Sequence, residues 1–233
     1  MIEIIISGLL TAFLLGIAGS LSKNEFLPFA VAHYSFLSIG LLAFLHLPVE
    51  WYPLLTPVLL VLLGTSGSAL SLSLALGIGL YLLSGSQIPL TAYLIGSFSF
   101  NPFIVLALLV LPGLYVREVL MAWFFPEMAR AAGVPRFYEV LPLIFIGLVV
   151  AASVQAFGML FVPPLTVFPA AAIHYWANRK WRFWIFSLAS GSLAALAFLV
   201  ALAFPTLPLG IVLTLVLFLF GGIGYAYRVL KPK

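Results

Sequence analysis

Few side chains in this sequence could bind or transfer anything, because only 7% of the residues are charged. His33 and Gln155 lie inside long apolar runs, where an ionisable or amide side chain is a candidate for a transport pathway. A packing hydrogen bond between helices is the ordinary alternative. The sequence leaves both readings open for these two residues. The same holds for Glu25, near the inner end of the second apolar run, and for the weaker candidates Tyr93, Asn101 and Ser153.

Two other histidines lie near the ends of apolar runs. His46 is expected at the outer surface, where it could meet an arriving ion. His174 stands beside Tyr175 and Trp176, a composition typical of an anchor at the membrane interface.

The longest polar segment, Arg117–Glu139, carries six of the sixteen charged side chains and separates two very apolar regions. Within it, Glu127, Ala129 and Gly133 form the pattern E-x-A-x-x-x-G. Pro126 suits the first turn of a helix, Glu127 suits its positive end, and Gly133 suits its termination. Small residues also allow a partner to approach closely. We therefore expect a short helix outside the membrane that contacts another protein.

A protease is the competing interpretation of one motif. Gly64-Thr65-Ser66-Gly67 matches G-x-S-G, the serine motif of rhomboid intramembrane proteases, and His174 could act as its base. The motif has only three fixed letters in a chain rich in Gly and Ser. A tight connection of small residues is the simpler explanation. A membrane scaffold without transport activity is a further alternative.

The composition identifies the class of protein. Hydrophobic residues make up 64% of the chain and its mean hydropathy is +1.26, whereas soluble domains carry about 25% charged residues. We expect an all-α, polytopic bundle with about eight or nine transmembrane helices, forming one domain over residues 1–233. The net charge of +4 is expected to record membrane topology rather than nucleic-acid binding. The sequence has no Walker A motif, so ATP hydrolysis would need another chain.

Apolar runs and their breakers locate the membrane segments. At a rise of about 1.5 Å per residue, the third, fourth and seventh runs are too short to cross alone. The runs are Ile2–Leu21, Phe29–Leu47, Tyr52–Leu63, Ala69–Leu83, Leu90–Leu111, Val140–Val162, Leu165–Trp176, Phe183–Phe204 and Gly210–Leu230.

The basic residues favour one topology. With about nine crossings and the N-terminus outside, every Lys and Arg falls on the inner side. Arg117–Glu139 and the C-terminus are then cytoplasmic, and Ser66 lies at a cytoplasmic turn.

Several passages resemble the ABC-3 family, the membrane subunits of zinc, manganese and iron importers. Residues 124–135 read FFPEMARAAGVP, similar to the family's F-D-P-E-x-A-x-x-x-G-V-P. Residues 157–172, FGMLFVPPLTVFPAAA, are similar to V-G-V-L-L-V-x-A-L-L-x-x-P-A-A-x-A. YLIG at 93–96 and PLGIVL at 208–213 are similar to Y-L-F-G and P-x-G-x-x-I-V-L.

An N-terminal string of the family, R-R-M-S-L-L-G-D-A-L-S-H, also has a counterpart. Lys23 and His33 align with its second Arg and its His, whereas Phe29 replaces its Asp. In the family, the Asp and His lie one helical turn apart and look like metal ligands. The resemblance therefore implies a pathway role for His33, and Phe29 is the main departure from the pattern.

The resemblance implies a transport subunit rather than an enzyme, located in a bacterial or archaeal cytoplasmic membrane. Its expected partners are an ABC ATPase, a second copy of the chain and an extracytoplasmic metal-binding protein. The expected cargo is a divalent transition-metal ion, moved by alternating access, and no cofactor is expected on this chain. Contact with the ATPase is expected through Pro126, Glu127, Ala129, Arg130 and Gly133.

Overall fold

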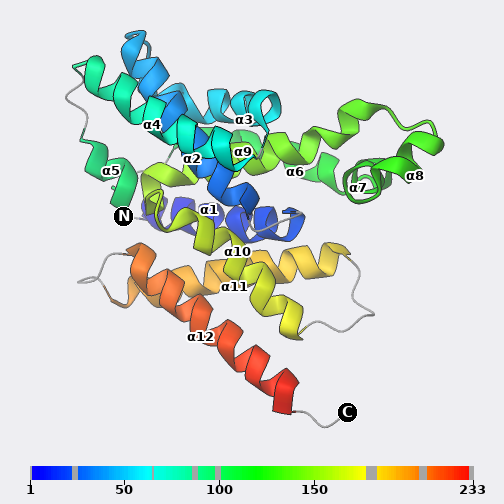
Figure 1. Ribbon diagram of the computed structural model, residues 1–233. Coiled ribbons are helices and arrows are strands. Elements are labelled where there is room, and N and C mark those ends of the chain that lie inside the picture. The colour runs from blue at the N-terminus through cyan, green and yellow to red at the C-terminus, as the bar shows by residue number, and fades with distance from the viewer. Residues whose placement is uncertain are drawn as a thin grey trace. The chain divides into compact units, whose positions relative to one another are not determined.

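In the computed structural model, the described residues are 2–22, 26–64, 66–85, 89–97, 101–176, 183–204 and 209–230. Within them, all regular secondary structure is helical (Figure 1). This confirms the predicted all-α class. The helices are α1 (Ile2–Leu21), α2 (Phe26–Phe44), the 3-10 helix η1 (Val49–Trp51), α3 (Tyr52–Leu63), α4 (Gly67–Leu83), α5 (Leu90–Ile95), α6 (Phe103–Leu114), α7 (Arg117–Phe124), α8 (Pro126–Ala131), the 3-10 helix η2 (Arg136–Glu139), α9 (Leu141–Phe157), α10 (Val162–Trp176), α11 (Phe183–Leu202) and α12 (Leu209–Leu230).

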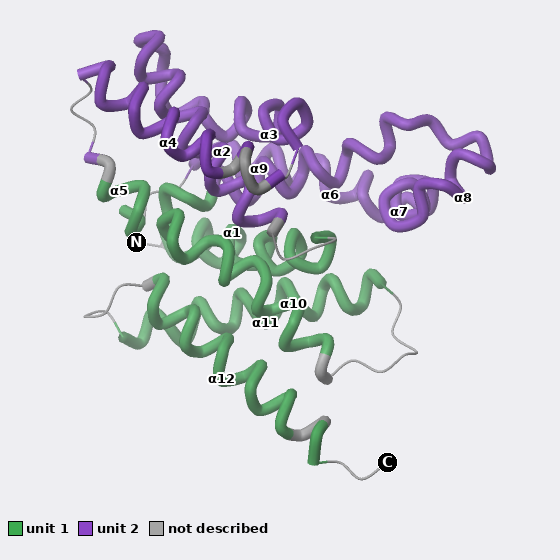
Figure 2. Tube along the Cα trace, viewed as in Figure 1, with its two compact units in different colours: residues 1–22, 90–100, 153–233 green, residues 23–89, 101–152 purple. Residues whose placement is uncertain are grey.

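Backbone contacts divide the chain into two compact units, each built from separate stretches of sequence (Figure 2). Unit 1 consists of Met1–Ser22, Leu90–Phe100 and Ser153–Lys233, and unit 2 of Lys23–Pro89 and Asn101–Ala152. The last turns of α9 therefore belong to unit 1 and the rest of that helix to unit 2.

In unit 2, α2 packs closely against α4 because glycines face each other at the crossing. A Cβ on Gly40 would collide with the backbone of Gly77. On another side of α2, the Tyr34 hydroxyl donates a 2.7 Å hydrogen bond to the carbonyl of Gly64, which ends α3. Thr56 of α3 also donates a 3.1 Å hydrogen bond to the buried Ser38 hydroxyl. Small side chains and paired hydroxyls thus hold these helices together, as expected within a membrane.

In unit 1, the same kind of contact joins α1 to its neighbours. Gly16 lies directly against the backbone of Ser190 in α11, and Gly19 against that of Thr166 in α10. Buried Ser20 donates a 2.8 Å hydrogen bond to the Ser187 hydroxyl of α11. Helix α12 packs on α10 and α11. Helices α10 and α11 each contact both α1 and α12, so these two helices form the middle of the unit.

Four helical stretches are long and apolar enough to cross a membrane, and the bent pair α6–α7 would add a fifth. This supports the prediction of a polytopic membrane protein. The orientation of the termini stays a prediction. The four long stretches are Glu3–Leu21, Leu27–Phe44, Arg136–Phe157 and Phe183–Leu202, and the shorter apolar ones are Val49–Leu63, Ser71–Leu83, Val162–His174 and Gly210–Ala226.

The fifth apolar run, Leu90–Leu111, does not form the single helix that its composition predicts, so this expectation is wrong. It contains the end of α5 at Ile95 and the start of α6 at Phe103. Gly96, with φ of 95°, takes the chain out of α5. Asn101 then accepts a 3.1 Å hydrogen bond from the Phe103 amide through Oδ1, which satisfies one free donor at the start of α6.

Candidate coupling helix and ion pathway

The polar segment Arg117–Glu139 does not continue along the axis of α6. A bend of 93° separates α6 from α7. Helix α7 is amphipathic and buries Val119, Ala122 and Trp123 within unit 2. It contacts both α8 and η2, so the polar segment forms a small packed structure of its own beyond the end of α6 (Figure 1).

Helix α8 begins and ends as the sequence predicts. Pro126 occupies its first turn and Glu127 lies beside it at the positive end. At the other end Gly133 has φ of 77°, in the left-handed region. The amides of Gly133 and Val134 donate hydrogen bonds of 3.1 and 2.9 Å to the carbonyls of Arg130 and Ala129. This is the Schellman arrangement, and it explains the spacing of Ala129 and Gly133.

The Ala129 side chain is buried within the protein and is not open to a partner. Its side chain is 1% exposed, while α7 packs against α8. A larger side chain there would push α8 away from α7. Ala129 thus positions α8, whereas the sequence suggested that its small size admits a partner.

Three large apolar side chains of the segment are exposed among its charged residues. Phe125 is 60% exposed, Met128 64% and Phe137 57%, although they belong to the most polar part of the chain. Contiguous exposed apolar patches mark contact sites, so these three side chains are candidates for one. Sequence analysis missed these residues, and the available signal was their large apolar side chains within a polar segment.

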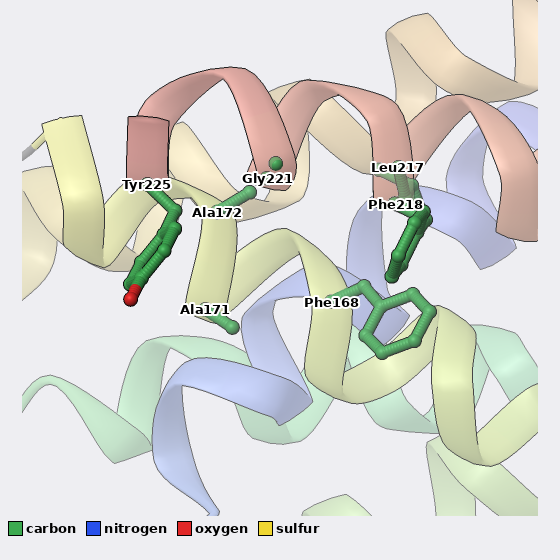
Figure 3. Close-up of a pocket in the computed structure, with 8 residues that line it drawn as sticks. Phe168, Ala171, Ala172, Leu217, Phe218, Gly221 and Tyr225 are labelled. Carbon is green, nitrogen blue, oxygen red and sulfur yellow. The ribbon is translucent and has the colours of Figure 1, made fainter. Parts of the chain in front are cut away.

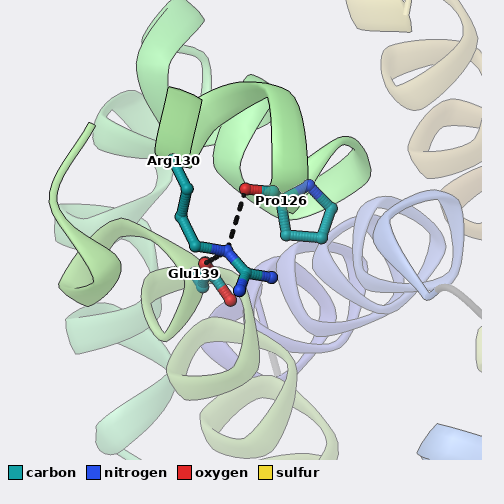
Figure 4. A network of polar contacts seen from close by, with 3 residues as sticks. All are labelled: Pro126, Arg130 and Glu139. Atoms are coloured by element: carbon teal, nitrogen blue, oxygen red, sulfur yellow. Dashed lines mark hydrogen bonds and ion pairs between the residues drawn. The ribbon is translucent and has the colours of Figure 1, made fainter. Parts of the chain in front are cut away.

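Arg130 is held along the helix rather than in a strong ion pair. Its Nε donates a 3.2 Å hydrogen bond to the carbonyl of Pro126 and lies 3.9 Å from Oε1 of Glu139 (Figure 4). Half of the Arg130 side chain is exposed, so the ion pair contributes less than about 1 kcal/mol. Glu127 is exposed and available to a partner.

His33 has one ring nitrogen occupied and one free for a ligand. Its Nδ1 lies 2.7 Å from the carbonyl oxygen of Phe29, and a carbonyl only accepts, so Nδ1 carries the proton. In the neutral form of this ring, Nε2 is then the nitrogen with a lone pair, as in most metal-binding histidines. The imidazole is half-buried. Phe29 lies one helical turn before it on the same face of α2, is 43% exposed and offers no ligand.

Gln155 lies at a break between helices of unit 1. Its main-chain carbonyl accepts hydrogen bonds from the Ser97 amide at 2.8 Å and from the Ser97 hydroxyl at 3.2 Å. The Met159 amide donates at 2.8 Å to the carbonyl of Tyr93, so the ends of α5 and α9 cap each other. The YLIG and FGML passages are thereby brought together. The Gln155 side chain is half-buried at this junction.

The other described candidate ligands belong to several different elements of the two units. Asn101 and Ser153 are buried, and His46 is exposed with φ of 54° beyond the end of α2. Glu25 lies outside the described residues. His33 belongs to unit 2 and Gln155 to unit 1. Among the described residues, no three His, Asp or Glu side chains are grouped to hold a metal ion.

The residues of the protease hypothesis are found in different units. Ser66 precedes α4 in unit 2, with its side chain exposed and no capping hydrogen bond to that helix. His174 is an exposed residue of α10 in unit 1.

A groove of about 340 Å³ lies between α10 and α12 in unit 1 (Figure 3). Its floor is made of small residues, so the helix backbones are accessible, and its rim is aromatic. A floor of this kind is typical of places where another helix packs closely within a membrane. The lining residues are Phe168, Ala171, Ala172, Leu217, Phe218, Gly221, Gly222 and Tyr225.

These features define a polytopic helical membrane protein with a short polar segment that carries α7 and α8 between its long apolar helices. Residues 64–224 match the ABC 3 transport family, and the chain belongs to that family. His33 lies before the matched region.

Comparisons with individual proteins agree with this assignment. Over 91 residues the chain is 29% identical to the manganese import system permease protein ScaB of Streptococcus pneumoniae, which covers 39% of this chain and 33% of that protein. The aligned part thus spans about a third of the relative's length.

Two solved structures share the fold. PsaBC from Streptococcus pneumoniae in complex with Fab gives a TM-score of 0.79 at 21% identity, covering 95% of this chain and 89% of the other. An inward-facing metal-chelate type ABC transporter gives a TM-score of 0.58 at 16% identity, covering 95% and 85%.

Proposed function

We propose that this chain is the membrane permease of an ABC importer for a divalent transition-metal ion. The observation that carries the proposal is the structure of α8, closed by Gly133 and presenting exposed apolar side chains, in a chain of the ABC 3 transport family. The chain itself has no Walker A motif, so a separate ABC ATPase supplies the energy.

The ATPase docks on the outer face of α8. Phe125 and Met128 act as apolar anchors that fill pockets of the ATPase, since a few large side chains usually carry most of the binding energy. Exposed Glu127 and Arg130 provide charged contacts at the rim. Ala129 and Gly133 fix the direction of the helix. ATP-driven closure of the ATPase pair then moves α8 and α7 together, because Ala129 packs them into one body.

The cargo is a divalent transition-metal ion, with manganese as the first candidate because the matched relative is a manganese import permease. His33 contributes Nε2 as a nitrogen ligand. One neutral imidazole binds a hydrated divalent ion weakly, which suits a transient site along a pathway. An extracytoplasmic metal-binding protein delivers the ion.

A second copy of the chain completes the permease. The floor of the α10–α12 groove supports this part of the proposal, because Ala171, Ala172, Gly221 and Gly222 leave the backbone accessible to a partner helix. Transport then follows from alternating access between the two copies.

Reconstitution tests the function. Proteoliposomes containing the chain and its ATPase should accumulate Mn²⁺ only when ATP is supplied on the ATPase side. ATP-independent flux, or no flux with Mn²⁺, Zn²⁺ or Fe²⁺, would contradict the proposal. Loss of membrane-substrate cleavage on Ser66→Ala would instead support the protease hypothesis.

A further inference from the structure

A second groove, of about 410 Å³, lies in unit 2 between α3, α6 and α9. Its walls include the exposed side chains of Val58, Leu62 and Leu106, while Leu148 on its floor is only 2% exposed. The lining is aliphatic throughout. It consists of Leu54, Pro57, Val58, Val61, Leu62, Leu106, Val110, Val140, Ile144 and Leu148.

One end of this groove meets the polar segment. Val110 lies in the last part of α6, shortly before the bend into α7, and Val140 directly follows η2. Tyr115 and Tyr138, both half-buried, belong to the same end of these helices. Tyrosines of this kind concentrate at the level of the lipid headgroups. The groove therefore runs from the headgroup level into the apolar part of the membrane.

Two arginines lie near the same ends of α6 and α9 as these tyrosines. Arg117 follows the end of α6, and Arg136 lies four residues before Val140. Both side chains are exposed, and among the described residues neither lies within ion-pair distance of a carboxylate. A guanidinium group binds phosphate through two parallel hydrogen bonds. Each of these two guanidinium groups can hold phosphate oxygens in this way.

The shape of the groove distinguishes a lipid from a helix. An empty apolar concavity within a membrane loses dispersion contacts, and an apolar lining does not hold water. A partner helix packs best on Gly or Ala, as in the α10–α12 groove, but this groove has neither in its lining. Branched Leu, Val and Ile side chains leave an uneven channel, which a flexible hydrocarbon chain can follow.

We propose that this groove binds one acyl chain of an anionic phospholipid, whose phosphate is held by Arg136 and Arg117. The lipid contacts α9 immediately after η2, so it connects the membrane to the segment that carries α8. This inference needs only the membrane location of the chain and not the proposed transport function.

Lipid retention tests the proposal. The full chain is purified in mild detergent from membranes containing phosphatidylglycerol and phosphatidylcholine, and bound lipid is counted by native mass spectrometry. Val58→Trp fills the groove and should lower retained phosphatidylglycerol by about tenfold. Leu109→Trp is the matched control, because Leu109 is a 74% exposed residue of α6 that does not line the groove. Leu62→Trp, at the exposed edge of the groove, provides a second filling variant.

The headgroup is tested separately. Arg136→Gln should reduce the preference for phosphatidylglycerol over phosphatidylcholine, whereas Arg130→Gln should leave it unchanged. Equal retention by wild type and both filling variants would overturn the proposal. So would an unchanged lipid count accompanied by conversion of a dimer into a monomer, since a second copy would then cover the groove. A wild-type protein without preference for the anionic lipid would overturn the role of the arginines.

Discussion

The amide of Val134 donates a 2.9 Å hydrogen bond to the carbonyl of Ala129 and closes α8. This bond forms only because Gly133, between them, adopts a φ of 77°. The same turn directs Val134 and Pro135 back toward η2. The E-x-A-x-x-x-G spacing therefore describes a helix with a defined end, in which Ala faces inward and Gly reverses the chain.

Gly133→Ala should weaken the end of α8. A left-handed conformation costs a residue with a Cβ about 1–2 kcal/mol, and no neighbouring atom would obstruct the added methyl group. We expect ATP-driven uptake to fall while the chain still inserts and folds. Gly113→Ala is the control, since Gly113 lies within α6 and also has open space around it. Equal uptake by both variants would remove the link between this turn and transport.

Phe29→Asp should strengthen metal binding. The new carboxylate would lie one helical turn from His33, and the pair would supply the carboxylate and imidazole that a divalent transition metal prefers. We expect Mn²⁺ affinity, measured by calorimetry on the purified protein, to rise by about tenfold. His33→Ala should abolish the gain. If the affinity of Phe29→Asp does not depend on His33, this face of α2 is not the ion pathway.

Gly222→Leu should separate the two copies without unfolding the chain. Gly222 lines the α10–α12 groove, and a Cβ added there meets nothing within 4 Å. The Leu side chain would fill the groove, and the dimer should dissociate at about tenfold higher concentration in size-exclusion chromatography with light scattering. Gly79→Leu is matched, because Gly79 in α4 has equally open surroundings. An unchanged dimer would place the contact elsewhere.

The sequence predicts the parts of this fold that depend on local rules. Pro126 and Gly133 mark the ends of α8, and continuous apolar runs mark the membrane helices. Breaks that depend on distant partners are not visible in the same way. The α5–α6 break is an example. The end of α9 lies so close to position 96 that only glycine fits there, since a Cβ would lie 2.7 Å from the carbonyl oxygen of Ala156.

The candidate site shows the same division. The bounds of α8 follow from the spacing of Pro126 and Gly133. The burial of Ala129 and the exposure of Met128, however, depend on how α7 packs against α8. The His33 ring orientation depends on a bond to its own helix, which the sequence spacing allows but does not require. Tyr34 was not singled out, yet its hydroxyl joins α2 to the end of α3. The sequence around a Tyr in an apolar run does not indicate which carbonyl oxygen will accept the hydrogen bond from its hydroxyl.

Binding of the ATPase to the outer face of α8 is the most direct test of the central proposal. The equilibrium constant should be measured between the purified permease and its ABC ATPase for wild type, for Phe125→Ala combined with Met128→Ala, and for Val116→Ala. Val116 is an apolar control residue, 45% exposed and directly before the segment. We predict at least about tenfold weaker binding for the double variant and no change for Val116→Ala. Equal affinity for all three proteins, or no binding by the wild type, would contradict the account.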